Sequence, residues 1–539
     1  MHSDILKNMS GRSDLAIVVS LLIIGVLTRI PFASRMIFEG DSARFAMAMR
    51  EYDIAQMKPH APGYILYIAL AKFVNLFVSD SRLSMLGISI ISSALTAVLL
   101  YYLARRMYDG FTAFTAAVLL FSSPLFWFNG EMPLTYALEG LFSAAFAYAC
   151  FRVINKEKRW LFISAVVLGL ATGVRQNIII IFFPLWLFSF RKYSVKDILI
   201  AICIFGLTCL TWFAPMIILT GGLKKYLQVI NAQYSTWVAY PAPFSFQIKE
   251  RGKIFSRFMA YSLGVGLIPF IYYLARDFRM RLIKEDTRLK FLLSWIMPGI
   301  LFFIGVNIWN PGHVVVILPP LFIMLSEAVK RMSGGLYAAY IKIGRSGAAE
   351  PAKRFTHMAS GKIIAVVSIV LITAVNSYAF LAKDTPVSYS TIERQDSDLE
   401  ELIRLTRANS EPDKTMLLAF FYSTQASIYL PDYRIYCPFP LIFDKVTVPI
   451  GAQNVYVSFQ HQTTPKTYWI PTGFRIKPIV IPEGIDKIVL WESEVASYYK
   501  NPKRPLEEIT SKINGTKIYV LTVKPEEKIY YDYHYLSVG

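Results

Sequence analysis

The sequence predicts a mainly α-helical membrane protein, in which a polytopic helical bundle precedes a small C-terminal α/β domain. Hydrophobic residues make up 55% of the 539-residue chain, whereas soluble domains average roughly 45–50% apolar residues. The excess lies in long blocks, and a helix needs about 20 mostly apolar residues to cross a bilayer. After residue 383 these blocks give way to short, strand-like segments. The expected domains are therefore a membrane module, 1–383, and an extracytoplasmic domain, 384–539.

Eleven segments are apolar enough to be predicted as membrane spans. They are 15–32, 84–104, 111–128, 134–151, 160–174, 177–190, 197–219, 256–275, 291–308, 314–330 and 362–382. Segment 15–32 also resembles a signal peptide, but Arg29 interrupts its end and no small-residue cleavage site follows. We therefore interpret it as a retained first helix.

A further apolar stretch, 63–79, decides the topology. If it lies along the membrane interface, the basic loops between spans share one side with the N-terminus; if it crosses, they face outward. These loops contain Arg105-Arg106, 152–159, 191–192, 276–288 and 331–362. Because cytoplasmic loops are enriched in Lys and Arg, an interfacial 63–79 is favoured, and Lys72 agrees with it. The net charge of +19 then reflects these loops and not a nucleic-acid partner.

The tail is expected to fold outside the plasma (inner) membrane as a small α/β domain. An amphipathic helix over 396–407 precedes the strand-like blocks. These blocks are Met416–Phe421, Val455–Phe459, Lys487–Trp491 and Lys517–Val523.

Neither a P-loop, a dinucleotide fingerprint, a zinc-ligand spacing nor a serine nucleophile elbow occurs in the sequence. The four cysteines form neither a disulfide framework nor a metal pattern.

Two acidic residues stand in segments predicted to reach the external face. Asp41 follows the first span, and Glu131 lies in the tight turn 129–133. Asp41 can be read as the N-cap of a helix over 42–51, and Glu131 as a solvated turn acid near a helix N-terminus. Ionisable groups near the membrane are costly to hold, however, and these two share a face. We therefore expect both to converge on one substrate.

The basic candidates also have two interpretations each. Arg175 interrupts an apolar stretch, where it either anchors a helix end by snorkelling or holds a phosphate. His313 follows Pro311-Gly312 and is either structural or in contact with substrate. Lys58 and His60 bind either lipid headgroups in general or the phosphate of a particular lipid.

Several short motifs resemble those of the GT-C glycosyltransferases, in the branch of protein O-mannosyltransferases and the lipid A aminoarabinose transferase. They are Gly40-Asp41, 59–64, 130–133, 173–175, 212–215 with Gly221-Gly222, and 311–313 followed by Leu318-Pro319. The resemblance covers roughly residues 15–330. It departs from the family at Glu131, where many relatives have Asp, and at His60-Ala61-Pro62, which replaces a more usual His-Pro-Pro.

The resemblance implies an inverting transfer of a sugar from a polyprenyl-phosphate donor to a lipid, glycan or protein acceptor on the outer face. It implies that Asp41 is the base and that Arg175, with Lys58 or His313, stabilises the leaving phosphate. Catalytic roles fall to Asp41 and Glu131, and substrate binding to Glu39, Arg44, Lys58, His60, Tyr64, Arg175 and His313. A divalent cation is compatible with these residues but not required by them.

Two other classes remain open from the sequence. A transporter would use charged groups within the membrane, but it usually shows internal repeats, and none is visible here. A non-catalytic membrane scaffold would use the tail 384–539 for binding and would tolerate the loss of Asp41 and Glu131.

Overall fold

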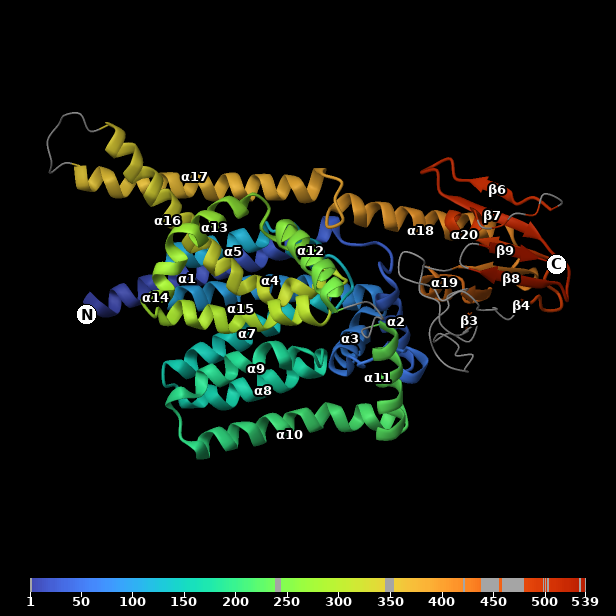
Figure 1. Cartoon of the computed structure of the whole chain (residues 1–539), viewed down its shortest axis with the longest axis horizontal. Helices are drawn as coiled ribbons and strands as arrows, with labels where there is room; N and C mark the ends of the chain where they lie inside the picture. The colour runs from blue at the N-terminus through green and yellow to red at the C-terminus, as the bar shows by residue number, and fades with distance from the viewer. Residues whose placement is uncertain are drawn as a thin grey trace. The chain divides into compact units, whose positions relative to one another are not determined.

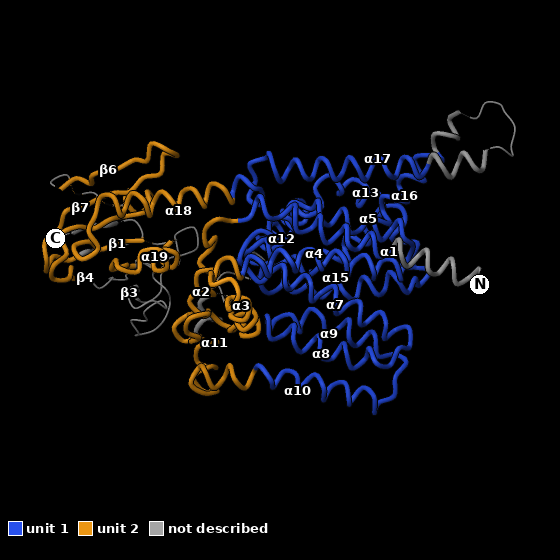
Figure 2. The backbone as a smooth tube through the Cα atoms, turned by 180° about the vertical axis from the view of Figure 1, so that it is seen from behind, with its two compact units in different colours: residues 1–33, 85–212, 244–391 blue, residues 34–84, 213–243, 392–539 orange. Residues whose placement is uncertain are grey.

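The computed structural model divides the chain into two compact units, each assembled from three segments of sequence (Figure 2). Unit 1 contains residues 1–33, 85–212 and 244–391, and unit 2 contains 34–84, 213–243 and 392–539. The residues that the structure describes are 2–237, 244–344, 353–419, 422–437, 455–457, 479–497, 499, 501, 504–532 and 535–538.

Unit 1 is a bundle of helices (Figure 1). Its helices are α1 (His2–Leu27), α5 (Gly110–Phe121), α6 (Pro124–Gly130), α7 (Tyr136–Ile154), α8 (Lys158–Val174), α9 (Ile178–Ser189), α12 (Phe244–Leu263), α13 (Leu267–Tyr273), α14 (Arg279–Ile283), α15 (Thr287–Gly305), α16 (Leu318–Gly344) and α17 (Lys353–Ala382). Most of α4 (Ser81–Met107) and α10 (Val195–Thr220) also belongs to it, and the 3-10 segment η6 (Pro311–Ile317) leads into α16.

The prediction of a polytopic helical membrane protein is confirmed. Within the described part of the chain, eight helical segments are long and apolar enough to cross a membrane. They are Asp14–Phe32, Ser81–Met107, Tyr136–Ile154, Val195–Thr220, Gln247–Ile283, Thr287–Gly305, Pro311–Ala338 and Gly361–Ala382. The pair α5 and α6, bent by 66°, makes a ninth if it is one broken span.

Three of the predicted apolar segments form helices of 17 residues or fewer. The expected spans 160–174 and 177–190 are α8, with 17 residues, and α9, with 12. The stretch 63–79 forms α3 (Ile65–Val78), whose 14 residues are apolar but fall short of the roughly 20 that a crossing needs. Its length agrees with an interfacial position.

Buried aromatic residues and paired polar groups hold unit 1 together. The rings of Phe146 in α7 and Phe182 in α9 stack with centroids 5.2 Å apart. Trp295 in α15 donates to Ser143 Oγ at 2.9 Å, and Ser143 donates to the carbonyl of Val316 at 2.5 Å. Inside an apolar bundle every polar group needs such a partner, so these bonds fix how α7, α15 and η6 pack.

The basic loops predicted to be cytoplasmic meet one another in unit 1. Lys330 Nζ lies 2.6 Å from Asp109 Oδ2, and Arg281 Nη2 donates to Tyr108 Oη at 3.2 Å. The Arg106 guanidinium lies 5.8 Å from the Tyr148 ring centroid. The same end of the bundle also contains a bond from Tyr193 Oη to the Val153 carbonyl and an ion pair between Lys158 and Asp197. These contacts place the loops at one end of unit 1, as a shared membrane side requires.

Unit 2 combines short helices with two sheets. Its helices are α2 (Gly40–Arg50), α3, α11 (Leu223–Trp237), α18 (Tyr389–Asn409, which begins in unit 1), α19 (Ser423–Tyr429) and α20 (Ser493–Ser497). Its strands are β1 (Thr415–Leu418), β2 (Arg434–Cys437), β3 (Val455–Val457), β4 (Ile479–Val480), β5 (Lys487–Leu490), β6 (Glu507–Thr510), β7 (Lys517–Thr522), β8 (Lys528–Asp532) and β9 (Tyr535–Val538).

The six-stranded sheet has the order β3-β2-β1-β5-β7-β6. Its strands β3, β2, β1 and β5 are parallel, with Leu417 opposite Ile435 and Val489, whereas β7 is antiparallel to β5 and β6. The second sheet is antiparallel, in the order β4-β8-β9. All four predicted strand blocks coincide with strands, although 420–421 and 458–459 lie outside the described residues. The α/β character expected of the tail is therefore confirmed.

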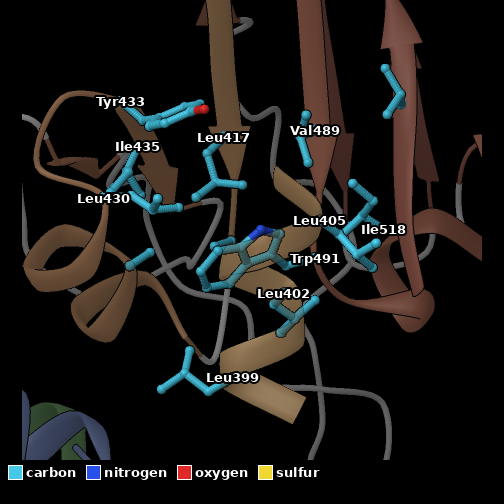
Figure 3. Packing of buried hydrophobic residues seen from close by; sticks show 13 residues of the cluster. Leu399, Leu402, Leu405, Leu417, Leu430, Tyr433, Ile435, Val489, Trp491 and Ile518 are labelled. Atoms are coloured by element: carbon cyan, nitrogen blue, oxygen red, sulfur yellow. The ribbon is translucent and has the colours of Figure 1, made fainter. Parts of the chain in front are cut away.

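The helix predicted over 396–407 packs its apolar side against the larger sheet. Leu399, Leu402 and Leu405 of α18 lie around Trp491, with strand residues such as Leu417 on the other side (Figure 3). Trp491 Nε1 donates to Thr406 Oγ1 at 2.8 Å, so its only polar atom is satisfied inside this core.

Candidate active site

Asp41 belongs to the first turn of α2, and its carboxylate is held by side chains. The helix begins at Gly40 with Glu39 as its N-cap, so the interpretation of Asp41 as the cap is wrong. Its carboxylate instead accepts a hydrogen bond from Arg44 Nη1 at 3.1 Å, and His60 Nδ1 lies 3.4 Å from the same Oδ1 atom. The Asp41 side chain is 35% exposed, so this carboxylate is accessible as well as held.

The turn before α3 brings His60 and Tyr64 together. His60 Nε2 and the Tyr64 hydroxyl are 2.9 Å apart. Gly63 has φ +119, and a Cβ there would lie 2.6 Å from Ile54 Cδ1 and 2.7 Å from Tyr52 Oη. Only glycine fits this position. The crowded turn therefore sets the path of the chain between the two rings.

Lys58 is anchored beside this turn. Its Nζ lies 2.6 Å from Glu51 Oε2, and the backbone of Lys58 pairs with that of Asp53. Lys58 is 6% exposed. Six sequence-predicted site residues thus share the segment 34–84 of unit 2: Glu39, Asp41, Arg44, Lys58, His60 and Tyr64.

The tail positions this segment within unit 2. Asp396 of α18 accepts hydrogen bonds from Ser34 Oγ at 3.0 Å and from the backbone N–H groups of Arg35 and Met36 at 2.6 and 3.1 Å. Burial raises the pKa of Asp396, although these bonds favour its charged form. A further bond joins Ile37 N–H to Tyr429 Oη of α19. The chain that leads into α2 is therefore fastened to the C-terminal domain.

A second group of predicted residues lies inside unit 1. Arg175, the C-cap of α8, donates to Glu139 Oε1 at 3.0 Å and contacts His313 Nε2 at 3.0 Å through its other terminal nitrogen. Glu139 also accepts from Thr135 Oγ1 at 2.6 Å. The Arg175 and Glu139 side chains are 10% and 3% exposed. Arg175 is thus part of a buried ionic network, and a snorkelling position is excluded.

A small cavity adjoins this network. Polar side chains of Glu139, Arg175, Asn177 and His313 line it together with Ile178, Ile181, Phe302, Phe303 and Val316. His313 Nδ1 and Asn177 Oδ1 are buried and have no hydrogen-bond partner in the part of the chain that the structure describes. Because guanidinium only donates, His313 Nε2 accepts from Arg175, which leaves a proton on Nδ1. The cavity therefore presents a buried donor and a buried acceptor.

Glu131 is fully buried at the end of α6, which overturns the interpretation as a solvated turn acid. Its Oε1 accepts from Trp127 Nε1 at 2.5 Å, and Oε2 has no hydrogen-bond partner among the described residues. The Arg29 guanidinium lies 4.7 Å from the Trp127 ring centroid and donates to the Phe121 carbonyl at 3.2 Å. Glu131 is therefore buried within unit 1 next to an aromatic ring and a guanidinium group.

The predicted residues thus form three groups, and three residues of the two groups in unit 1 were not predicted from the sequence. Glu139 pairs with Arg175, Asn177 lines the cavity, and Arg29 lies over Trp127 beside Glu131. An available signal was the position of Glu139 inside an otherwise apolar predicted span, because a charge there requires a partner. In the described residues, no three His, Cys, Asp or Glu side chains gather as a metal-binding group.

Comparisons with known proteins bear on both the sequence and the fold. Residues 59–219 match the family model of dolichyl-phosphate-mannose-protein mannosyltransferases. No curated protein sequence matches the chain. The structure of ArnT from Cupriavidus metallidurans bound to undecaprenyl phosphate superimposes with a TM-score of 0.56 at 10% identity, over 94% of this chain and 97% of that chain. The apo state of the same enzyme gives 0.55 at 10% identity, over 96% and 98%.

The structural likeness extends over nearly the whole chain, including the tail, whereas the family match is confined to the part that contains His60, Tyr64, Glu131 and Arg175. At such low identity the superposition shows the fold, and the family match adds a relationship in sequence. The resemblance to the GT-C glycosyltransferases is therefore confirmed, by sequence over residues 59–219 and by fold over most of the chain.

Proposed function

We propose that this protein is a membrane glycosyltransferase that moves a sugar from a polyprenyl-phosphate donor to a hydroxyl group of a lipid, glycan or protein acceptor, with inversion. The family match supports sugar transfer from a lipid phosphate, and a similarly folded enzyme has been solved with undecaprenyl phosphate. The observation that carries the proposal is the Asp41 carboxylate, held by Arg44 beside His60 and still partly exposed.

Asp41 is proposed as the general base. A base must come within hydrogen-bond reach of the proton it removes. As Asp41 takes the acceptor's hydroxyl proton, the acceptor oxygen forms a bond to the anomeric carbon of the sugar. The bond from that carbon to the phosphate oxygen breaks on the opposite face, and its electron pair leaves with the polyprenyl phosphate. A single displacement of this kind inverts the anomeric centre.

Cationic side chains are proposed to stabilise the negative charge that grows on the leaving phosphate. Lys58 and Arg175 each have a carboxylate partner, Glu51 and Glu139, which holds the side chain in place before the substrate arrives. Preorganised donors of this kind stabilise developing charge without reorganisation. Glu131 is proposed to hold the acceptor or the donor sugar through its second carboxylate oxygen, and Glu39, Arg44, His60, Tyr64 and His313 to line the substrate.

The protein is further proposed to act in the plasma (inner) membrane, with segment 34–84 and the tail on the outer side. The contacts among its basic loops support this orientation, because such loops concentrate in the cytoplasm.

The test is to incubate the purified full-length protein with a panel of radiolabelled polyprenyl-phosphate sugars and native membrane extract, and to identify the labelled product. Asp41→Asn should keep folding and donor binding and should lower turnover by about two orders of magnitude or more. Asp432→Asn, which removes an exposed carboxylate of unit 2, is the matched control and should transfer normally. Near-normal transfer by Asp41→Asn, or no product from any donor, would contradict the proposal.

A further inference from the structure

Three side chains of unit 2 form a line that ends on the proposed base. Tyr64 Oη lies 2.9 Å from His60 Nε2, and His60 Nδ1 lies 3.4 Å from Asp41 Oδ1. Arg44 Nη1 donates to the same Oδ1 atom at 3.1 Å. The imidazole ring therefore lies between a phenol hydroxyl, to which it is hydrogen-bonded, and a carboxylate, which it approaches.

The chemistry of Tyr64 and Asp41, the two ends of this line, determines which nitrogen of His60 carries the proton. A carboxylate oxygen repels a lone pair and accepts only from donors, so the tautomer that suits the nitrogen facing Asp41 is Nδ1–H. In a neutral imidazole Nε2 is then the acceptor, and the Tyr64 hydroxyl is its donor. At 3.4 Å the Nδ1–Oδ1 contact is close but is not a formed hydrogen bond, for which the usual range is about 2.7–3.2 Å. Catalytic contacts of this kind often tighten only when substrate binds.

The backbone holds Tyr64 in an unfavourable conformation to make this contact. Tyr64 has φ 46 and ψ 32, in the left-handed region that costs a residue with a side chain roughly 1–2 kcal/mol. The Phe45 ring of α2 packs against Tyr64 with centroids 5.1 Å apart and against His60 at 5.8 Å. Strain that the surrounding packing maintains is a reason to look for a function at that residue.

We propose that His60 is a positioning residue for Asp41 and that Tyr64 sets its tautomer. The Tyr64 hydroxyl keeps Nε2 unprotonated, and Nδ1–H then directs Asp41 Oδ1. With Arg44 on the same oxygen, two donors fix the rotation of the carboxylate and hence the direction of Oδ2 toward the acceptor. This role rests on the proposed function, but the tautomer itself does not.

The tautomer is tested without measuring activity. The full-length protein, reconstituted in lipid and labelled with ¹⁵N in its histidine rings, is examined by solid-state NMR. Because the chain has six histidines, the spectrum of His60→Asn is subtracted to isolate His60. The expected result is a neutral ring protonated on Nδ1 in the wild type and a mixture of tautomers in Tyr64→Phe. A ring protonated on Nε2, or on both nitrogens, in the wild type overturns the proposal.

The positioning role is tested by kinetics with two substitutions that place an amide at different ends of the ring. His60→Asn keeps an N–H near the position of Nδ1, whereas His60→Gln moves it toward Nε2. We expect His60→Gln to lower kcat by about 10- to 100-fold, as loss of an orienting partner does at other sites. His60→Asn should recover most of this loss, because it restores the N–H that faces Asp41.

Tyr67→Phe is the matched control for Tyr64→Phe. Tyr67 packs on the same Phe45 ring with centroids 5.1 Å apart, but its buried hydroxyl has no hydrogen-bond partner in the described residues. Only Tyr64→Phe should lower kcat. Equal kcat values for His60→Asn and His60→Gln, while Asp41→Asn remains inactive, would overturn the positioning role and leave the proposed function intact. An active Asp41→Asn would overturn the proposed function itself.

Discussion

Glu139 shows at the scale of one residue how a charge is kept inside the bundle. Its carboxylate accepts from Arg175 and from Thr135, and the side chain is 3% exposed. An unpaired charge in such a place is expensive, and removing one partner of a buried pair costs about 3–5 kcal/mol. The pair therefore holds Arg175 at the cavity while keeping the local charge neutral.

Glu139→Gln should lower the midpoint of thermal unfolding in detergent, because it leaves the Arg175 guanidinium without its counter-charge. Glu285→Gln is the control, since the Glu285 side chain is 80% exposed and pairs with Lys290 at 3.3 Å. The double variant Glu139→Gln/Arg175→Gln should recover part of the loss, because it removes both charges. Equal midpoints for Glu139→Gln and Glu285→Gln would show that the buried pair contributes nothing.

At the scale of elements, an ion pair links the turn between β7 and β8 to the segment before β6. Arg504 donates to both Glu527 oxygens, at 2.7 and 2.9 Å, and the Lys524 N–H donates to Oε2. The hydrogen bonds from Arg504 lower the pKa of Glu527, outweighing the opposite effect of burial. A lowered carboxyl pKa means that the folded state releases this proton more readily than the unfolded chain.

The stability from Glu527 should therefore be present above the unfolded pKa, about 4.3, and be lost as pH falls through the lower folded value. Calorimetry of the full-length protein from pH 7 to pH 3 should show a higher unfolding midpoint for wild type than for Glu527→Gln at pH 7. The gap should close at the acidic end. Glu526→Gln changes the exposed neighbouring carboxylate and should leave the wild-type profile intact. A gap that persists unchanged at pH 3 would contradict this assignment.

At the scale of the whole molecule, the basic loops that meet in unit 1 predict the membrane orientation. In a variant without native cysteines, Arg106→Cys should react with an impermeant thiol reagent only from the cytoplasmic side. Trp309→Cys, at a residue that is 55% exposed between α15 and η6, should react only from outside. Glu131 is fully buried and makes a poor reporter. If position 309 reacts only from the cytoplasm, 63–79 crosses the membrane and the proposed site is on the wrong side.

The tail is predicted to fold without the membrane module, because the cluster around Trp491 is built from residues between 399 and 520. A fragment of about 388–539 should give a dispersed NMR spectrum and no transferase activity, and Trp491→Ala should abolish that dispersion. Deleting the tail from the full chain should weaken acceptor use more than donor hydrolysis. An unfolded fragment would place the domain boundary elsewhere, and full activity of the truncated enzyme would exclude a role in acceptor access.

Much of the fold was predictable because its signals are local. Hydropathy alone located the long helices, and short apolar runs after residue 383 located β1, β3, β5 and β7. Strands β2, β4, β6, β8 and β9 were missed, since strands of two to five residues offer too few positions for a pattern to stand out. The predicted segments 160–174 and 177–190 agree within two residues with the ends of α8 and α9.

The sequence by itself determined that this is a polytopic membrane protein with an α/β tail, and it singled out Asp41, His60 and Arg175. Composition and short motifs are sufficient for these conclusions, because both are read from residues that lie close together in the chain. Only the tertiary structure decided that Glu131 is buried, that Glu139 holds Arg175, and that Ser34 is fastened to Asp396. These facts depend on which distant segments pack together: Ser34 and Asp396 are more than 300 residues apart, and no local pattern encodes their contact.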